Sequence, residues 1–143
     1  GHPEDMDRIK DSFARQGLMQ TLGAELAEIA EGRVVITAPI TPAASQQHGF
    51  AHAGMTFALG DSAAGYSALS LMPEGAEVLT AEMKINLLAP ADGIRLIATG
   101  EVVKPGRKLV VVRATVETET ADGTRKPVAI LQGTMVPVIP KSG

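Results

Sequence analysis

The 143-residue sequence contains no cysteine and no tryptophan, and its aromatic residues are three Phe and one Tyr. The absence of cysteine excludes disulfides, thiolate nucleophiles and thiolate metal sites, and it suits a reducing compartment. The first five residues are polar and lack the apolar core of a signal peptide. We therefore expect a cytoplasmic protein. With so few aromatic side chains, the composition does not indicate which substrate a pocket would hold.

The charge balance does not indicate a polyanionic partner. Thirteen basic residues stand against 16 acidic ones, for a net charge of −3, and the basic residues do not gather in a run. A nucleic-acid-binding surface would concentrate Lys and Arg, so nucleic acid is not expected as a partner. The length fits a single domain over residues 1–143, enough to bury about two-thirds of the surface of the unfolded chain.

A long apolar run extends from Ala53 to Met72 and contains a single carboxylate, Asp61. A run of about 20 apolar residues has the length to span a bilayer, but a carboxylate near its middle would cost several kcal/mol there. We therefore predict a buried helix and no membrane association. An ionised Asp in such a helix loses solvation unless another group pairs with it or the protein uses it. Asp61 therefore marks a candidate site.

The spacing of apolar residues predicts one shorter helix and six strands around the long helix. Their expected ranges are Asp5–Gln16 for the helix, Leu22–Ile29 and Arg33–Ile40 for a hairpin, and Val78–Leu88, Ile94–Lys104, Leu109–Thr120 and Pro127–Ile139 for the later strands. Gly17 is expected to stop the first helix. This order predicts an α+β domain in which one antiparallel sheet, ending in a three- or four-strand meander, curls around one central helix.

Two details of these strands carry expectations about position. In the strand that follows the long helix, strict alternation places Leu79 and Met83 on one face and Thr80 on the other, polar face. Pro137 and Pro140 predict that the last strand ends as an edge, because proline cannot donate a hydrogen bond to a neighbouring strand.

The residues that lead into the long helix form a motif over positions 46–61. An amide residue, Gln46, is followed by His52, Gly54, Leu59 and Asp61 at fixed spacing. Two further segments accompany it, Leu87-Leu-Ala-Pro90 at a strand end and Lys104-Pro-Gly-Arg-Lys108 in a hairpin. In this order and spacing, the sequence resembles the hotdog-fold acyl-CoA thioesterases, specifically the PaaI-like (phenylacetyl-CoA thioesterase-like) branch.

The resemblance covers most of the chain, from about Phe13 to Met135, with two departures in the motif. Ala53 replaces the first glycine of the family's His-Gly-Gly, and Gln46 stands where the family most often has Asn. The resemblance implies a hotdog fold that hydrolyses a small to medium acyl-CoA or aryl-acyl-CoA thioester. Coenzyme A is then part of the substrate, and neither a metal nor another cofactor is needed. The alternatives are a hotdog dehydratase or hydratase and a non-catalytic acyl-CoA-binding module.

Asp61 would serve as the general base that activates water, or as the nucleophile that forms an anhydride. Its helical neighbours three and four residues away are Phe57, Ala58, Ala64 and Gly65. Such apolar surroundings should raise the pKa of the carboxyl, which suits a base that works near neutral pH. The alternative is a buried Asp that caps a backbone group or pairs across a subunit contact.

Gly54 lies at the expected start of the long helix, where unpaired backbone N–H groups suit a developing oxyanion. The alternative is that this glycine only permits close helix–sheet packing; the resemblance favours the oxyanion role. Seven residues of helix separate Gly54 from Asp61, a rise of roughly 10 Å, so one chain cannot bring both to a single carbonyl carbon. We therefore expect a homodimer that shares each site between two chains, or a tetramer built from two such dimers.

The resemblance implies supporting roles for the polar residues ahead of the helix. Gln46 or Gln47 would orient water or the thioester through its amide, and Gln46 is favoured. His52 would support the turn, with proton transfer as its less favoured role, whereas His48 would line the pocket or lie in solvent. The spacing of the two histidines matches zinc ligands on a helix, but no third ligand is evident and no metal is expected.

Three residues further along the chain complete the candidate site. Thr80 stands where the family often has a Ser or Thr that contacts the helical carboxylate, and its position on the polar face would allow this only if that face met a partner subunit. Arg107 and Lys108, with Lys104 beside them, are candidates for binding the phosphates of coenzyme A. The alternative is that these charged residues of a hairpin tip are simply solvated.

Overall fold

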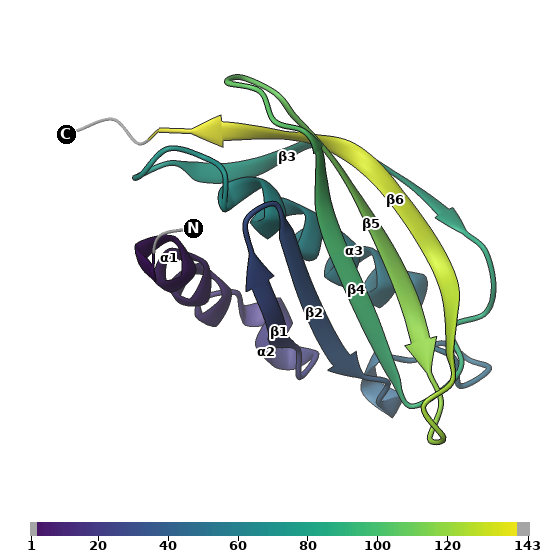
Figure 1. The fold of residues 1–143 in the computed structure, drawn as a ribbon. Coiled ribbons are helices and arrows are strands. Elements are labelled where there is room, and N and C mark those ends of the chain that lie inside the picture. Colours follow the sequence, from purple (N-terminus) through teal and green to yellow (C-terminus); the bar gives the residue numbers. More distant parts are fainter. Residues whose placement is uncertain (1–2, 140–143) are drawn as a thin grey trace.

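The computed structural model describes residues 3–139, and a long helix, α3 (Ala53–Leu69), lies along the concave face of a six-stranded antiparallel sheet (Figure 1). The strand order is β1-β2-β4-β5-β6-β3. The strands are β1 (Glu25–Ala30), β2 (Arg33–Pro39), β3 (Glu77–Leu87), β4 (Arg95–Lys104), β5 (Val110–Glu119) and β6 (Arg125–Val138). The remaining elements are α1 (Pro3–Ala14), α2 (Gly17–Thr21) and a 3-10 turn, η1 (Pro42–Ala44). This arrangement confirms the expected α+β hotdog fold.

Small residues let α3 approach the sheet closely. A side chain on Gly100 of β4 would place its Cβ 2.2 to 2.4 Å from backbone atoms of Ala63 and Ala64. A Cβ on Gly60 of the helix would lie 2.8 Å from a methyl carbon of Leu131 in β6. The backbones of α3 and β4 are therefore in direct contact at Gly100, and a larger residue there would push the helix and the sheet apart.

The helices differ from their predicted ranges at their ends. Helix α3 stops at Leu69 rather than at Met72, and the guanidinium of Arg8 donates to the carbonyls of Leu69, Met72 and Pro73 at 2.7 to 3.2 Å. Gly17 does not simply stop the first helix; it begins the short helix α2. The first strand consequently starts at Glu25.

The predicted meander is correct only for β4, β5 and β6. Strand β3 lies at the opposite edge of the sheet from β1 and pairs with β6, while β4 pairs with β2. Strand β6 has β5 and β3 as neighbours over most of its length, but residues 136–138 pair with β3 alone, so the strand ends as an edge as predicted. Pro137 is tolerated because the pairing with β5 starts at Met135, so no strand lies on that side of the proline. Pro140 lies outside the described residues.

Strand β3 also departs from strict alternation. Its pairing with β6 shifts register between Thr80 and Glu82, so Ala81 is an additional residue, a β-bulge. Before the bulge, Thr80 pairs with the buried Met135, and after it Met83 pairs with the buried Gly133. Thr80 and Met83 consequently share the face toward α3, contrary to the prediction that placed them on opposite faces.

Candidate functional site

Helix α3 begins with a side-chain cap from His52. This residue has φ −64° and ψ 141°, and its Nδ1 accepts a hydrogen bond from the N–H of Gly54 at 2.8 Å. An acceptor nitrogen carries no proton, so in this geometry the neutral ring holds its proton on Nε2. His52 thus has the supporting position at the turn that the resemblance implied.

The cap determines which backbone donor is available at the helix start. The N–H of Gly54 is bound to His52, and the N–H of Met55 donates to the carbonyl of His52 at 2.9 Å. Within residues 3–139, the N–H of Ala53 has no hydrogen-bond acceptor. The donor suited to an oxyanion is therefore that of Ala53, one residue before the predicted Gly54. The sequence-based prediction missed Ala53 because it took the glycine at position 54 as the mark of the donor. The signal that could have found Ala53 was His52, a polar residue placed to cap the second N–H of the helix.

The loop before the helix is held by Gln46. Its side-chain Oε1 accepts from the N–H of His48 at 2.5 Å and from that of Phe50 at 3.4 Å, and its backbone N–H donates to the carbonyl of Phe50 at 2.8 Å. With Oε1 engaged in the loop, the amide nitrogen is the part of Gln46 left to contact a ligand. Gln47 is exposed, and across the described ranges its side chain makes no such bonds.

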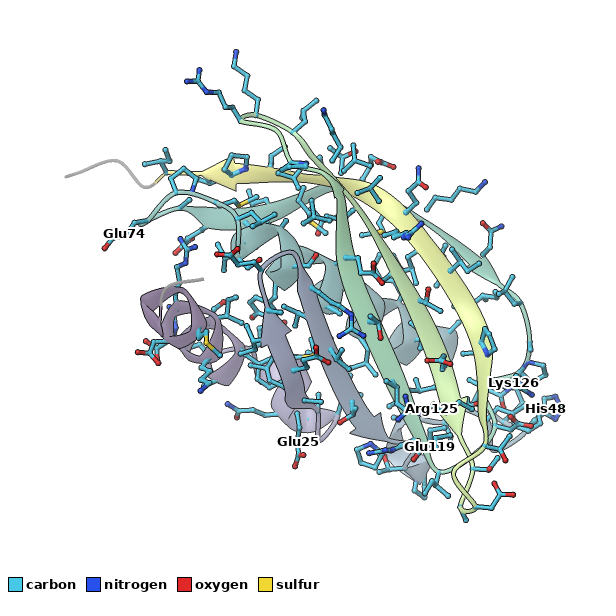
Figure 2. All side chains as sticks on the ribbon, viewed as in Figure 1. Glu25, His48, Glu74, Glu119, Arg125 and Lys126 are labelled. Carbon is cyan, nitrogen blue, oxygen red and sulfur yellow. The ribbon has the colours of Figure 1, made fainter. Side chains whose placement is uncertain are left out.

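A hollow of about 700 Å³ lies beside this loop. It brings together four predicted site residues, namely Gln46, Gln47, His48 and His52, with Ala53 beside them. Leu87, the last residue of β3, and the segment 88–91 that follows it form another wall. In Figure 2, His48 lies at the same end of the molecule as Lys126, whereas Glu74 lies at the opposite end.

Asp61 lies further along α3 and outside this hollow. The hydroxyl of Thr80 donates to Oδ1 of Asp61 at 2.7 Å, and the same oxygen of Thr80 lies 3.3 Å from Sδ of Met135. Partial burial raises the pKa of the Asp61 carboxyl, and the hydrogen bond from Thr80 offsets part of that rise. The contact between Thr80 and Asp61 forms within one chain, so it does not require the partner subunit that the prediction invoked.

The donor and the carboxylate are well separated along the helix. Asp61 lies eight positions after Ala53, a rise of roughly 12 Å. Neither Asp61 nor Thr80 lines the hollow beside the loop. One chain therefore carries two half-sites: a donor half-site at Gln46, His52 and Ala53, and a carboxylate half-site at Asp61 and Thr80.

The basic hairpin residues lie at the opposite end of the sheet from the donor half-site. Arg107 and Lys108 are exposed in the turn between β4 and β5. The register of the sheet places this turn at the end where β3 begins, opposite the end where β3 meets the hollow. Within one chain, this separates them from the predicted site residues that line the hollow, whereas Thr80 pairs with Met135, the partner of Val110 at the start of β5.

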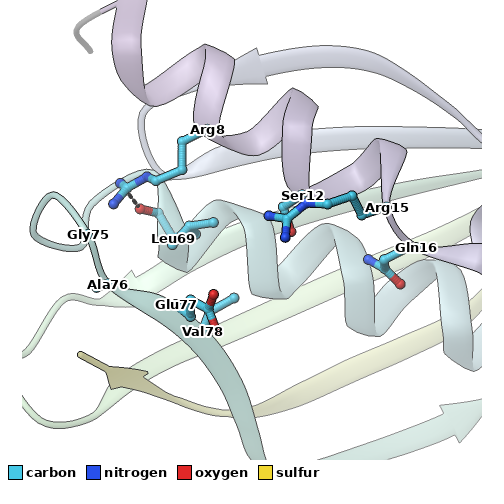
Figure 3. Close-up of a pocket in the computed structure, with 9 residues that line it drawn as sticks. All are labelled: Arg8, Ser12, Arg15, Gln16, Leu69, Gly75, Ala76, Glu77 and Val78. Carbon is cyan, nitrogen blue, oxygen red and sulfur yellow. Dashed lines mark hydrogen bonds between the residues drawn. The ribbon is translucent and has the colours of Figure 1, made fainter. Parts of the chain in front are cut away.

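A second hollow, of about 410 Å³, lies between α1 and the start of β3 (Figure 3). None of the predicted site residues lines it. Arg8 reaches from α1 to the carbonyl of Leu69, and the hydroxyl of the buried Tyr66 accepts a hydrogen bond from Gln16 at 2.8 Å. These contacts fasten α1 to the end of α3, and they explain the polar side chains of this hollow.

Between residues 3 and 139, no group of three or more His, Asp or Glu side chains is placed to hold a metal ion. In the same range, no helix has the length and apolar character needed to cross a membrane.

Comparison with known proteins identifies the family of the chain. Residues 48–123 match the model of the thioesterase superfamily. A curated relative, a 1,4-dihydroxy-2-naphthoyl-CoA hydrolase of Listeria monocytogenes, is 29% identical over 105 residues, which are 72% of this chain and 85% of the relative.

Solved structures show the same relationship. A thioesterase family protein from Silicibacter pomeroyi is 46% identical, with a TM-score of 0.92 over 95% of this chain and 99% of that one. The PaaI protein of E. coli, from the phenylacetic acid degradation operon, is 22% identical, with a TM-score of 0.81 over 94% of this chain and 93% of its own, and shares the fold. The chain therefore belongs to the thioesterase superfamily and has its hotdog fold.

Proposed function

We propose that the protein hydrolyses acyl-CoA thioesters at a site completed by two subunits. The observation that carries this proposal is the pair of separated half-sites in one chain. One half-site offers a backbone N–H, that of Ala53, and the other a carboxylate, Asp61, whose pKa is raised by burial. A second chain that apposes its carboxylate half-site to the donor half-site would supply everything the hydrolysis requires.

The proposed chemistry assigns one role to each group. The N–H of Ala53 and the amide nitrogen of Gln46 donate to the thioester oxygen and stabilise the oxyanion. Asp61 of the other subunit removes a proton from water, which attacks the carbonyl carbon. The C–S bond then breaks, and the leaving thiolate of coenzyme A takes the proton from Asp61. Direct attack by Asp61, with an anhydride as intermediate, is the alternative.

The exposed edge of the sheet supports a homodimer. Strand β3 pairs only with β6 in the described residues, which leaves an 11-residue edge unpaired. Leu79 and Leu87 of this strand are 57% and 59% exposed, and exposed apolar edges invite pairing with another strand. We propose that two copies of β3 pair antiparallel across a two-fold axis. A tetramer would be built from two such dimers.

This dimer would also give the basic hairpin a role. Antiparallel pairing of two β3 strands sets the start of one beside the end of the other. The turn with Arg107 and Lys108 of one subunit would then face the end of the molecule where the other subunit has its hollow. There the two cations, with Lys104, would meet the phosphates of coenzyme A.

The acyl group is proposed only as a class. The relative from Listeria monocytogenes is named for a bicyclic aryl-CoA, and the PaaI protein belongs to a phenylacetic acid operon. We therefore propose an aryl-acyl or small to medium acyl thioester as the substrate.

A free-thiol assay over a panel of acyl-CoA esters tests the function. The panel contains 1,4-dihydroxy-2-naphthoyl-CoA, phenylacetyl-CoA, benzoyl-CoA and short aliphatic acyl-CoA esters. We expect turnover of at least one ester and a fall in kcat of at least about a hundredfold for Asp61→Asn. Glu82→Gln is the matched control, because Glu82 bonds to Thr134 on the outer face of β3.

The products separate the competing functions. Free acid and free coenzyme A support hydrolysis, whereas an intact thioester that has gained or lost water indicates a hydratase or dehydratase. Tight binding of the esters without turnover would indicate a binding module. Full activity of Asp61→Asn would remove this carboxylate from the mechanism.

A further inference from the structure

The bulge in β3 determines where Thr80 points. With regular alternation, Thr80 would share a face with Glu82 and Lys84, away from α3. The additional residue, Ala81, reverses the parity, so Thr80 faces the helix while Met83 and Ile85 beyond the bulge still pack against the core. A single extra residue thus allows β3 to keep its apolar packing and still contact Asp61.

The strand opposite the bulge has a glycine at the point of closest approach. A Cβ on Gly133 of β6 would lie 2.3 Å from the carbonyl oxygen of Glu82, 2.8 Å from Sδ of Met83 and 3.0 Å from its Cα. This oxygen is a backbone atom of Glu82, the residue that directly follows the bulge residue Ala81. No side chain fits at position 133 unless the backbone of β3 moves at the bulge.

We propose that Gly133 is a positioning residue for catalysis, because its lack of a side chain permits the bulge that aims the hydroxyl of Thr80 at Asp61. It acts through Thr80 and touches neither substrate nor the carboxylate. The inference rests on the proposed role of Asp61 as the base. Gly133 lies 72 positions from Asp61 in the sequence, and no family motif quoted above includes it.

The pKa of Asp61 can be used to measure whether the hydrogen bond from Thr80 is present, because of the residues that surround the carboxyl. Thr80 of β3 contacts the carboxylate, Met135 of β6 contacts Thr80, and neither of them titrates. Glu82 lies on the other face of β3, where it accepts a hydrogen bond from Thr134. Burial and Thr80 account for the shift in the pKa of Asp61 among the described residues. Loss of the bond from Thr80 would therefore raise that pKa further, since the bond favours the ionised form.

The test compares Gly133→Ala with Thr80→Val by activity and by ¹³C NMR of the Asp61 carboxyl in the ligand-free protein. For both variants, we expect the Asp61 titration and the acid limb of the kcat profile to move to higher pH. On that limb, kcat should fall about tenfold while KM stays the same. The double variant should show no further shift, because both changes remove one contact.

Gly106→Ala is the matched control. Its Cβ would lie 2.3 Å from the carbonyl oxygen of Leu109, an equally severe backbone clash in the turn between β4 and β5. It should cost stability and leave the Asp61 titration unchanged. In Gly133→Ala/Met83→Ala, the side-chain clash is relieved and the backbone clash remains, so the shift should persist.

Three results would overturn the proposal: an unshifted Asp61 titration in folded Gly133→Ala, a normal titration restored by Met83→Ala, or a further shift in the double variant with Thr80→Val. If Gly133→Ala does not fold, deletion of Ala81 removes the bulge directly, and an unshifted titration in that protein would count equally against it. The NMR measurement needs no turnover. A protein that hydrolyses no ester but shows the shift would therefore refute the proposed function and, with it, a role of Gly133 in catalysis, and would retain only the geometric inference that Gly133 positions Thr80 against Asp61.

Discussion

The donor half-site and the carboxylate half-site are built in different ways. The donor half-site is local: the side chains of Gln46 and His52 bond to backbone N–H groups two to four residues away. The carboxylate half-site is tertiary, because Asp61 receives its hydrogen bond from Thr80, 19 residues further along and on another element. The difference teaches that the proposed donors are preorganised by short-range hydrogen bonds, whereas the acidity of Asp61, the proposed base, depends on how the sheet packs on the helix.

The largest effect is expected from a substitution that removes the donor half-site and leaves the carboxylate half-site intact. Ala53→Pro removes the one N–H proposed to meet the oxyanion. Proline suits the first position of a helix, and the φ and ψ of His52 are those that a residue before proline adopts. We expect kcat to fall about a hundredfold to a thousandfold, measured by the free-thiol assay. Ala53→Ser, which keeps the N–H, should retain most of the activity; equal losses in both would contradict the donor role.

Mixing two inactive variants tests whether the halves come from different chains. Ala53→Pro lacks the donor and Asp61→Asn lacks the base, so a heterodimer would contain one site with both groups. After coexpression in equal amounts, about half of the dimers are mixed and each has one intact site of two, so we expect about a quarter of the normal activity. Sedimentation should show dimers or larger assemblies. No recovery in verified heterodimers would place both halves of a site in one chain.

The two adjacent glutamines sharpen the description of the donor half-site. Gln46→Ala removes the acceptor that holds the loop and the amide donor proposed for the thioester, so we expect kcat to fall about tenfold. Gln47→Ala should change kcat less than about twofold, because its side chain makes no bonds in the described loop. Steady-state kinetics of the two variants measure which glutamine matters more for kcat. A larger fall in kcat for Gln47→Ala than for Gln46→Ala would reassign the role to Gln47.

The smallest expected effect concerns stability at the carboxylate half-site. The pKa of Asp61 is raised by folding, so its ionised form disfavours the folded state above that pKa, and the cost vanishes below the ordinary value of 3.8. Asp61→Asn should therefore raise Tm at pH 7 by roughly 2–4 °C, with no gain at pH 3.

Asp122→Asn is the control of opposite sign. Hydrogen bonds from Thr120 and Thr124 lower the pKa of Asp122 to about 2. This carboxylate therefore stabilises the folded state above pH 3.8, and the contribution is lost as the pH falls toward 2. Calorimetry at several pH values measures both effects. A loss of Tm for Asp61→Asn at pH 7 would contradict the raised pKa.

The sequence predicted much of the fold because its patterns are local. The small residues of α3, the turn glycines and the alternating strands each express their structure within about ten residues. The errors in strand order and in side-chain direction arose where the structure of a strand depends on the strand that pairs with it. Neither the place of β3 beside β6 nor the bulge at Ala81 leaves a periodic signal in β3, since both depend on a strand some 50 residues away. Thr80 was assigned to the wrong face for this reason.

The candidate site was also predicted where its signals are local in the sequence. Asp61 stood out as the single carboxylate in an apolar run, and the motif over residues 46–61 brought Gln46 and His52 with it. The N–H of Gly54, predicted as the donor, is bound to the His52 ring, and this hydrogen bond is visible only when the turn is folded.

By itself, the sequence determined the central helix, the strands around it and a carboxylate that burial makes costly, because side-chain size and polarity fix these locally. Tertiary structure decided the rest: which N–H at the helix start is left for an oxyanion, how the bulge opposite Gly133 turns Thr80 toward Asp61, and how far apart the two half-sites lie. These properties depend on distances between backbones that are remote in sequence, and only packing sets those distances.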